Sequence, residues 1–208
     1  MNFTAVCYAL IAAALFGIST PVAKVLVGTT DPVVLAGLLY CGAGIGVALL
    51  RKLSGLLDGL PGTTEAALSR SDLPWLAGAI AAGGVVGPIL LLVGLTRTDA
   101  SAASLLLALE GVATALLAWF IFHENFDRRV ALGMLCLVAG AIVLSWSGSL
   151  TLGSVVGPLS IIGACIAWGL DNNLTRKISL ADPLQIVSLK GIIAGPVNLS
   201  LGLLAGGS

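Results

Sequence analysis

The sequence predicts an all-α integral membrane protein with about seven transmembrane helices. Of its 208 residues, 58% are hydrophobic and only 10% are charged, whereas a soluble domain is about 25% charged. Ten cations and ten anions are too few to keep the surface of a globule of this size in water, so the composition excludes a soluble enzyme and a disordered protein. The formal charge of zero provides no basic field that would attract nucleic acid.

Seven apolar stretches are long enough to cross a bilayer, which requires about 20 helical residues. The runs lack the alternation of a membrane barrel, and helices then remain as the structure that pairs every backbone group in lipid. The link over residues 51–72 is predicted as a polar surface loop with one short interfacial turn at 53–60. The expected spans are 3–27, 32–50, 73–95, 101–122, 130–146, 152–177 and 184–205.

The cations between the spans predict the orientation. Seven lie in the links that follow even-numbered spans, and two lie in the alternate links. Because cytoplasmic links carry the excess of Lys and Arg, we expect a multi-pass protein of the cell (plasma or inner) membrane with a cytoplasmic N-terminus. The seven are Arg51, Lys52, Arg70, Arg128, Arg129, Arg176 and Lys177, and the two are Lys24 and Arg97.

A weak internal repeat relates the two ends of the chain. At an offset of 152 residues, Gly17 aligns with Gly169 and Lys24 with Arg176. With one residue deleted, the Asp-Pro pair at 31–32 aligns with the pair at 182–183. The first and sixth spans then cross in opposite senses, an inverted repeat found in many secondary transporters, with the substrate site between the halves.

The repeat divides the chain into a five-helix unit, residues 1–148, and a partial second unit, residues 149–208. The second unit has room for two helices only, so we expect a fragment or a natural short form of a longer protein. Its uncovered helix faces would be covered by a homodimer partner or by partner helices.

Glu110 lies in the middle of the fourth span, among apolar and small neighbours. A carboxylate facing lipid costs several kcal/mol, so it is expected to face the bundle interior. Thr114 follows four residues later and shares its helix face. Glu110 is either a proton-linked or substrate-contacting acid, or a structural acid hydrogen-bonded to a neighbouring helix.

Asp171 and Lys190 lie at equal distances on either side of the turn between the last two spans. At 1.5 Å per residue, each is roughly 13 Å from the turn, so an ion pair is expected. Trp168 and Asn172 add an aromatic face and an amide nearby. The group is either a polar binding floor for a small zwitterion or cation, or a packing ion pair whose Lys190 reaches the interface.

The first span contains Ser19, Thr20 and Pro21 in its interior. A proline removes a helix hydrogen bond, and interrupted helices mark many transporter sites, so Thr20 is a candidate minor contact. The alternative is an ordinary proline-containing membrane helix.

Small residues and cysteines are predicted to pack inside the bundle. Glycines four residues apart favour close helix contact. They occur at Gly83 and Gly87, Gly153 and Gly157, and Gly191 and Gly195. The four cysteines lie in apolar runs without metal-ligand spacing, and all are expected to be small buried side chains. They are Cys7, Cys41, Cys136 and Cys165.

No catalytic motif is present in the sequence. The single histidine, His123, precedes Glu124 but has no second histidine four residues later, and neither a P-loop nor a G-x-S-x-G motif occurs. We therefore expect no enzyme, no metal and no cofactor. Glu124 itself is predicted to be solvated at a helix end.

Residues 94–110, GLTRTDASAASLLLALE, and the continuation from Thr114 to Glu124 resemble the third and fourth helices of EamA-type proteins of the drug/metabolite transporter superfamily. The resemblance covers 5–148 as one repeat and 155–205 as the start of a second. Gly111 stands where the family often has proline, and His123 where it often has glycine. The resemblance implies ten helices in two inverted five-helix repeats with both termini cytoplasmic.

The resemblance also implies export or exchange of a small metabolite or drug, coupled to protons in some members, through a cavity between helices one, three, four and six. We therefore expect a secondary transporter that works by alternating access. The alternative is a truncated or half-transporter module that needs a partner chain. The candidate substrate-binding residues are Glu110, Trp168, Asp171, Asn172, Lys190, Thr20 and Thr114.

Overall fold

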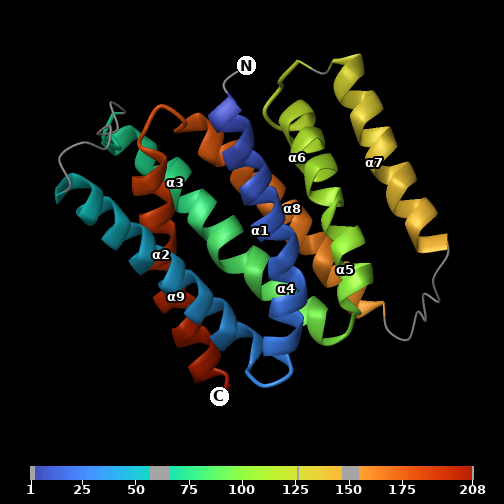
Figure 1. Cartoon of the computed structure of the whole chain (residues 1–208), viewed down its shortest axis with the longest axis horizontal. Helices are drawn as coiled ribbons and strands as arrows, with labels where there is room; N and C mark the ends of the chain where they lie inside the picture. Colours follow the sequence, from blue (N-terminus) through green and yellow to red (C-terminus); the bar gives the residue numbers. More distant parts are fainter. Residues whose placement is uncertain (1–2, 57–65, 126, 147–154, 208) are drawn as a thin grey trace.

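The computed structural model describes residues 3–56, 66–125, 127–146 and 155–207, and over these residues the chain is helical without a named strand (Figure 1). The all-α class predicted from the composition is confirmed. The helices are α1 (Phe3–Val27), α2 (Pro32–Leu56), η1 (Arg70–Asp72), α3 (Leu73–Ala79), the π-helical η2 (Ile80–Val86), α4 (Gly87–Thr96), α5 (Ala100–Leu107), α6 (Leu109–Phe120), α7 (Arg128–Trp146), α8 (Val156–Lys177) and α9 (Pro183–Leu204).

These helices form seven helical segments, because α3, η2 and α4 follow one another without a break and α5 continues into α6 after Ala108. Their bounds agree with the predicted spans to within a few residues. Five segments of the described chain are long and apolar enough to cross a membrane. The interfacial turn predicted at 53–60 is wrong at its start, since α2 continues to Leu56, and residues 57–60 lie outside the described chain.

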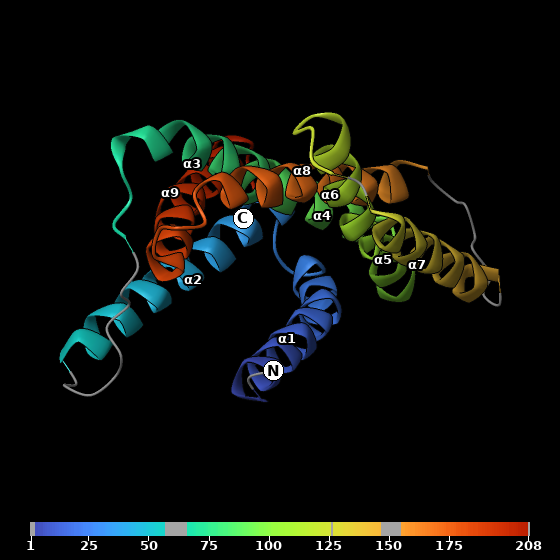
Figure 2. The same ribbon diagram turned by 90° about the horizontal axis from the view of Figure 1, so that it is seen from above.

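The segments alternate in direction, so the two termini lie at opposite ends of the molecule (Figure 1). Accordingly, α1 and α8 run in opposite directions, and so do α2 and α9. Viewed from above, the helices form an arc with α2 and α7 at its ends and α1 on its concave side (Figure 2). Helix α8 lies in the middle of the arc, where it packs against α3, η2 and α4 as well as α5 and α6.

The π-helical turn η2 ends at Val86, two residues before Pro88. Proline has no N–H, so a carbonyl four or five residues earlier loses its ordinary helical partner. Those carbonyls belong to Gly84 and Gly83, while the N–H of Gly87 bonds to the carbonyl of Ala82. The third span therefore presents backbone acceptors to side chains of other helices.

Helices α2 and α9 pack antiparallel through small residues. A Cβ atom on Gly44 would lie 2.5 Å from the backbone nitrogen of Ile192, and one on Gly195 would lie 2.7 Å from that of Cys41. Moving three residues along α2 thus moves the contact three residues back along α9. Glycine permits this approach because any side chain would strike the opposite backbone.

The predicted internal packing of glycine pairs is confirmed at four positions: a Cβ on Gly83, Gly87, Gly191 or Gly195 would meet another helix at clashing distance. Gly157 is equally crowded by Thr98, and Gly153 lies outside the described residues. The prediction that all four cysteines are buried is wrong. Cys165 is buried, Cys7 and Cys41 are half-buried, and Cys136 is exposed on α7.

Helices α2 and α9 begin in the same way. The Asp31 carboxylate accepts hydrogen bonds from the N–H groups of residues 33 and 34. The Asp182 carboxylate accepts from those of residues 184 and 185. In both helices a proline follows the aspartate, the position where a missing N–H costs nothing. The two Asp-Pro pairs therefore serve equivalent helix starts.

We predict that Gly44→Ala destabilises the protein by about 1–3 kcal/mol, because the new methyl group would overlap the backbone of α9. The matched control is Gly46→Ala on the same helix, where a Cβ would meet nothing within 4 Å. That substitution should leave the Tm unchanged or raise it, since alanine favours a helix. Thermal unfolding in detergent measures both, and equal Tm values for the two variants would contradict close packing of α2 on α9.

Candidate functional site

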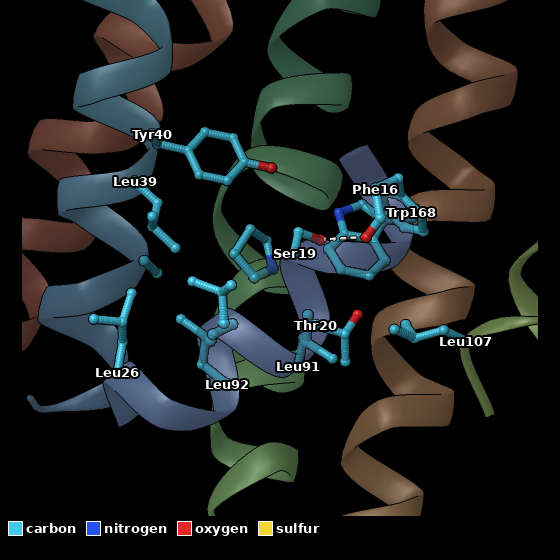
Figure 3. A pocket seen from close by; sticks show the side chains of 14 residues that line it. Phe16, Ser19, Thr20, Leu26, Leu39, Tyr40, Leu91, Leu92, Leu107 and Trp168 are labelled. Atoms are coloured by element: carbon cyan, nitrogen blue, oxygen red, sulfur yellow. Dashed lines mark hydrogen bonds between the residues drawn. The ribbon is translucent and has the colours of Figure 1, made fainter. Parts of the chain in front are cut away.

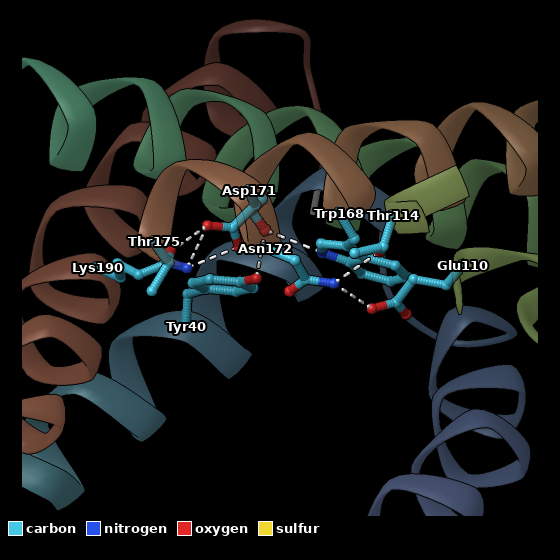
Figure 4. Close-up of polar contacts among 9 residues, drawn as sticks. Tyr40, Glu110, Thr114, Trp168, Asp171, Asn172, Thr175 and Lys190 are labelled. Carbon is cyan, nitrogen blue, oxygen red and sulfur yellow. Dashed lines mark hydrogen bonds and ion pairs between the residues drawn. The ribbon is translucent and has the colours of Figure 1, made fainter. Parts of the chain in front are cut away.

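A row of polar side chains extends from α9 across α8 to α6 and faces the concave side of the arc (Figure 4). Such a row at membrane depth is unusual, because polar groups in lipid require partners within the protein. The residues of the row are Lys190, Asp171, Thr175, Tyr40, Trp168, Asn172, Thr114 and Glu110.

The ion pair predicted from equal depth is present. The Nζ atom of Lys190 lies 2.6 Å from both carboxylate oxygens of Asp171. The hydroxyl of Thr175 donates a third bond to the same carboxylate at 2.9 Å. Asp171 is only 7% exposed, and the pair joins α8 to α9 with its charges neutralised.

Two glycines of the third span make room for α8. A Cβ on Gly83 would clash with the Asp171 carboxylate, and a Cβ on Gly87 would lie 2.7 Å from Nε1 of Trp168. The two glycines are four residues apart, so they lie on the same face of the helix. The glycine pair predicted to favour close packing therefore leaves room for the Asp171 and Trp168 side chains of α8.

The carbonyls released by Pro88 accept these side chains. The Gly83 carbonyl accepts hydrogen bonds from Nε1 of Trp168 at 3.1 Å and from the hydroxyl of Tyr40 at 2.6 Å. The Gly84 carbonyl accepts one from the amide of Asn198 at 2.9 Å. Three helices, α2, α8 and α9, are thus held to one interrupted turn.

Glu110 and Thr114 share one helix face, as predicted, and α8 contacts both. The amide nitrogen of Asn172 donates to Oε1 of Glu110 and to the hydroxyl of Thr114, each at 3.1 Å. Asn173 donates to the backbone carbonyl of Thr114 at 3.0 Å. The second carboxylate oxygen of Glu110 has no hydrogen-bond partner among the described residues, and Glu110 is half-buried.

A pocket of about 280 Å³ lies beside this row, between α1, α2, α4 and α8 (Figure 3). Its wall is mostly apolar, with Phe16, Tyr40 and Trp168 as aromatic members and Thr20 as a buried hydroxyl. Leu107 and Trp168 line it, and each lies about one helical turn before Glu110 or Asn172. The acid and the amide are not part of the pocket wall but lie next to Trp168, which belongs to it (Figure 4).

Of the seven predicted residues, the structure brings Trp168 and Thr20 into the pocket wall and joins Glu110, Asn172 and Thr114 by hydrogen bonds in the polar row beside it. The remaining two, Asp171 and Lys190, lie in the same polar row on the side toward α9.

Sequence reasoning missed Tyr40 and Asn198. Tyr40 lines the pocket, and Asn198 is fully buried against the interrupted turn. Each is a polar side chain within an otherwise apolar run, which was the available signal. Cys165, treated as a purely apolar residue, also donates its thiol to the Leu106 carbonyl at 3.5 Å.

Polar contacts join the helices at both ends of the molecule. Arg51 pairs with Asp182 at 3.0 Å, and Arg176 pairs with Glu124. The prediction that Glu124 is merely solvated is therefore wrong, because α8 ends beside it. At the other end, the ammonium of Lys24 donates to the carbonyl of Leu95 in the last turn of α4 and to that of Thr98 just after the helix.

Comparison with known proteins identifies the family that the sequence matches. The model of the EamA-like transporter family matches residues 3–146. An uncharacterized transporter of Methanothermobacter thermautotrophicus is 29% identical over 201 residues, which is 92% of this chain and 59% of that protein. The chain therefore spans less than two thirds of that relative's length.

A second relative is a probable 4-amino-4-deoxy-L-arabinose-phosphoundecaprenol flippase subunit, ArnE, of Pseudomonas aeruginosa. It is 41% identical over 78 residues, 38% of this chain and 65% of that protein. A crystal structure with 17% sequence identity superposes with a TM-score of 0.63, covering 93% of this chain and 67% of that chain. At this identity the likeness shows the fold.

We predict that Asp171→Asn is strongly destabilising, by about 3–5 kcal/mol, because it leaves the Lys190 ammonium without its carboxylate. Combining it with Lys190→Met removes the unpaired charge, so the double variant should have a higher Tm than Asp171→Asn alone.

The control for this cycle is Glu124→Gln combined with Arg176→Met, a pair whose side chains are 27% and 63% exposed. An exposed pair should show a coupling below about 1 kcal/mol. Strictly additive losses in the Asp171–Lys190 cycle would show that the two charges do not stabilise one another.

Proposed function

Because the chain belongs to the EamA-like transporter family, we propose that it carries out secondary active transport of a small metabolite or drug across the cell membrane by alternating access. The observation that carries this proposal is the pocket of about 280 Å³ beside a polar row at membrane depth. Apolar walls with a few placed polar groups are typical of small-molecule sites. The chain covers 59% of its longer relative, so the activity proposed is that of the whole protein.

We further propose that residues 1–148 form one repeat and residues 149–208 the beginning of an inverted second one. Support comes from the equivalent starts of α2 and α9, whose capping aspartates are 151 residues apart. A shift by this number exchanges the contact of Gly44 with Ile192 for the contact of Cys41 with Gly195. Exchange of contacts by one shift is what a two-fold relation between the repeats requires.

Alternating access requires contacts that can open at one end while those at the other end hold. The ion pairs Arg51–Asp182 and Arg176–Glu124 are candidates at the end that we propose to be cytoplasmic. The bonds from Lys24 to the carbonyls of Leu95 and Thr98, at the end of α4, are candidates at the other end. The N-terminus then faces the cytoplasm, as the distribution of cations indicates.

We propose Glu110, Asn172, Thr114, Trp168 and Thr20 as substrate contacts, since Trp168 and Thr20 line the pocket and the other three lie in the polar row beside Trp168. Asp171 and Lys190 complete the polar row, and we propose that they hold α9 to α8 while the substrate is bound. No enzymatic step is assigned to these residues.

The second candidate function is a helical module that transports only with a partner chain or a second copy. One observation favours it: α1 and α2 carry Gly17, Gly42 and Gly46, around which a Cβ would meet nothing within 4 Å. Gly83, Gly87, Gly191 and Gly195 are by contrast crowded by other helices, so the three open glycines mark faces suited to further helices.

The proposed transport is tested with the full-length protein in proteoliposomes and a library of small metabolites and drugs. Ser19→Phe should abolish the uptake seen for wild type, because Ser19 is exposed into the pocket and a phenyl ring there would fill it. Ala13→Phe, an equally exposed position of α1 outside the pocket, is the control. Uptake that survives Ser19→Phe would exclude the pocket as the transport site.

Proton coupling is tested separately at Glu110. We expect Glu110→Gln to alter the pH dependence of uptake more than the amount of folded protein, since the amide keeps the shape and cannot release a proton. A pH profile identical to that of wild type would remove Glu110 from the coupling mechanism.

A further inference from the structure

We propose that this site selects substrates with a single positive charge on an apolar body, such as protonated aromatic amines. The inference rests on the proposed function and narrows its substrate class. It follows from the charge left over in the polar row, the composition of the adjoining pocket and the groups that are already committed to other bonds.

Glu110 is the charge that remains when the polar row is paired. Asp171 is neutralised by Lys190, whose ammonium contacts both of its oxygens at 2.6 Å. Glu110 receives one neutral amide bond, from Asn172, and the described chain places no cation against it. An ammonium group is the partner that a carboxylate lacks at this depth.

The pocket beside Glu110 is suited to the apolar part of such a substrate. Aromatic faces of Trp168, Tyr40 and Phe16 contribute to its wall, and aliphatic side chains supply most of the remainder. Aromatic faces attract cations as well as apolar groups. A molecule lying in the pocket with its ammonium directed toward Glu110 would meet both kinds of partner.

The same groups disfavour a zwitterion or an anion. Among the described residues, no Lys or Arg lines the pocket, and the Lys24 ammonium, next to the pocket residue Ala23 in sequence, is bound to the Leu95 and Thr98 carbonyls. The Asn172 amide nitrogen already donates to two oxygens, and the Ser19 hydroxyl donates to the carbonyl of its own helix. A substrate carboxylate would therefore find no cation there, and the neutral Thr20 hydroxyl of the pocket wall does not replace one.

The experiment measures binding of four probes of similar shape to the purified full-length protein in detergent by equilibrium dialysis, with empty micelles as the blank. The probes are 2-phenylethylamine, 2-phenylethanol, phenylacetate and phenylalanine, which are a cation, a neutral molecule, an anion and a zwitterion. We expect the amine to bind at least about tenfold more tightly than the alcohol, with the anion and the zwitterion weaker than both.

Variants assign the preference to one residue. Glu110→Gln should bring the amine and the alcohol to within about threefold while leaving the alcohol's Kd unchanged, which also shows that the pocket is folded. Glu110→Asp keeps the charge and should keep the preference for the amine. Asp127→Asn, a matched loss of an exposed acid outside the pocket and outside the proposed gating contacts, should bind all four probes as wild type does.

Equal Kd values for the amine and the alcohol in wild type would overturn the inference. So would a preference that survives Glu110→Gln, phenylalanine binding as tightly as the amine, or no binding of the amine. The proposed function fails differently. Amine binding without uptake of any compound by proteoliposomes would contradict the proposed transport but not the proposed selectivity for amines. Uptake of neutral compounds without a preference for amines would contradict the selectivity but not the transport.

Discussion

The structure depends on one constraint of the bilayer: a polar side chain within it must find its partner inside the protein. Helix α8 carries Trp168, Asp171, Asn172 and Asn173 within six residues, too polar a run to face lipid. Their partners come from the third span, the fourth span and α9. The position of α8 at the centre of the arc follows, since no other place brings all three within reach (Figure 2).

Glycine and proline in the third span make this central position possible. Pro88 releases the carbonyls of Gly83 and Gly84, and side chains of three helices bind them. The absence of a side chain at Gly83 and Gly87 lets α8 approach closely enough for those bonds. An irregular turn at membrane depth is tolerated because it is buried in protein and its acceptors are used. The same residues that anchor α8 thus shape the floor of the pocket.

The sequence predicted what depends on a single helix or a single hairpin. Span limits follow from apolar length, the shared face of Glu110 and Thr114 from helical spacing, and the Asp171–Lys190 pair from equal depth about one turn. Contacts between distant segments were not accessible. Tyr40 reaches Gly83 only because α2 packs against α4, the helix that follows the π-helical turn. Cysteine burial failed for a related reason: an apolar run does not tell whether a residue faces lipid or protein.

The direct test of the central claim, that α8 depends on close approach to the third span, is the thermal unfolding of Gly83→Ala in detergent. A methyl group there would strike the paired carboxylate of Asp171, so the account predicts a Tm lower by about 5 °C or more. Gly140→Ala on α7, where a Cβ would meet nothing within 4 Å, supplies the comparison. A Gly83→Ala variant as stable as Gly140→Ala would contradict the account.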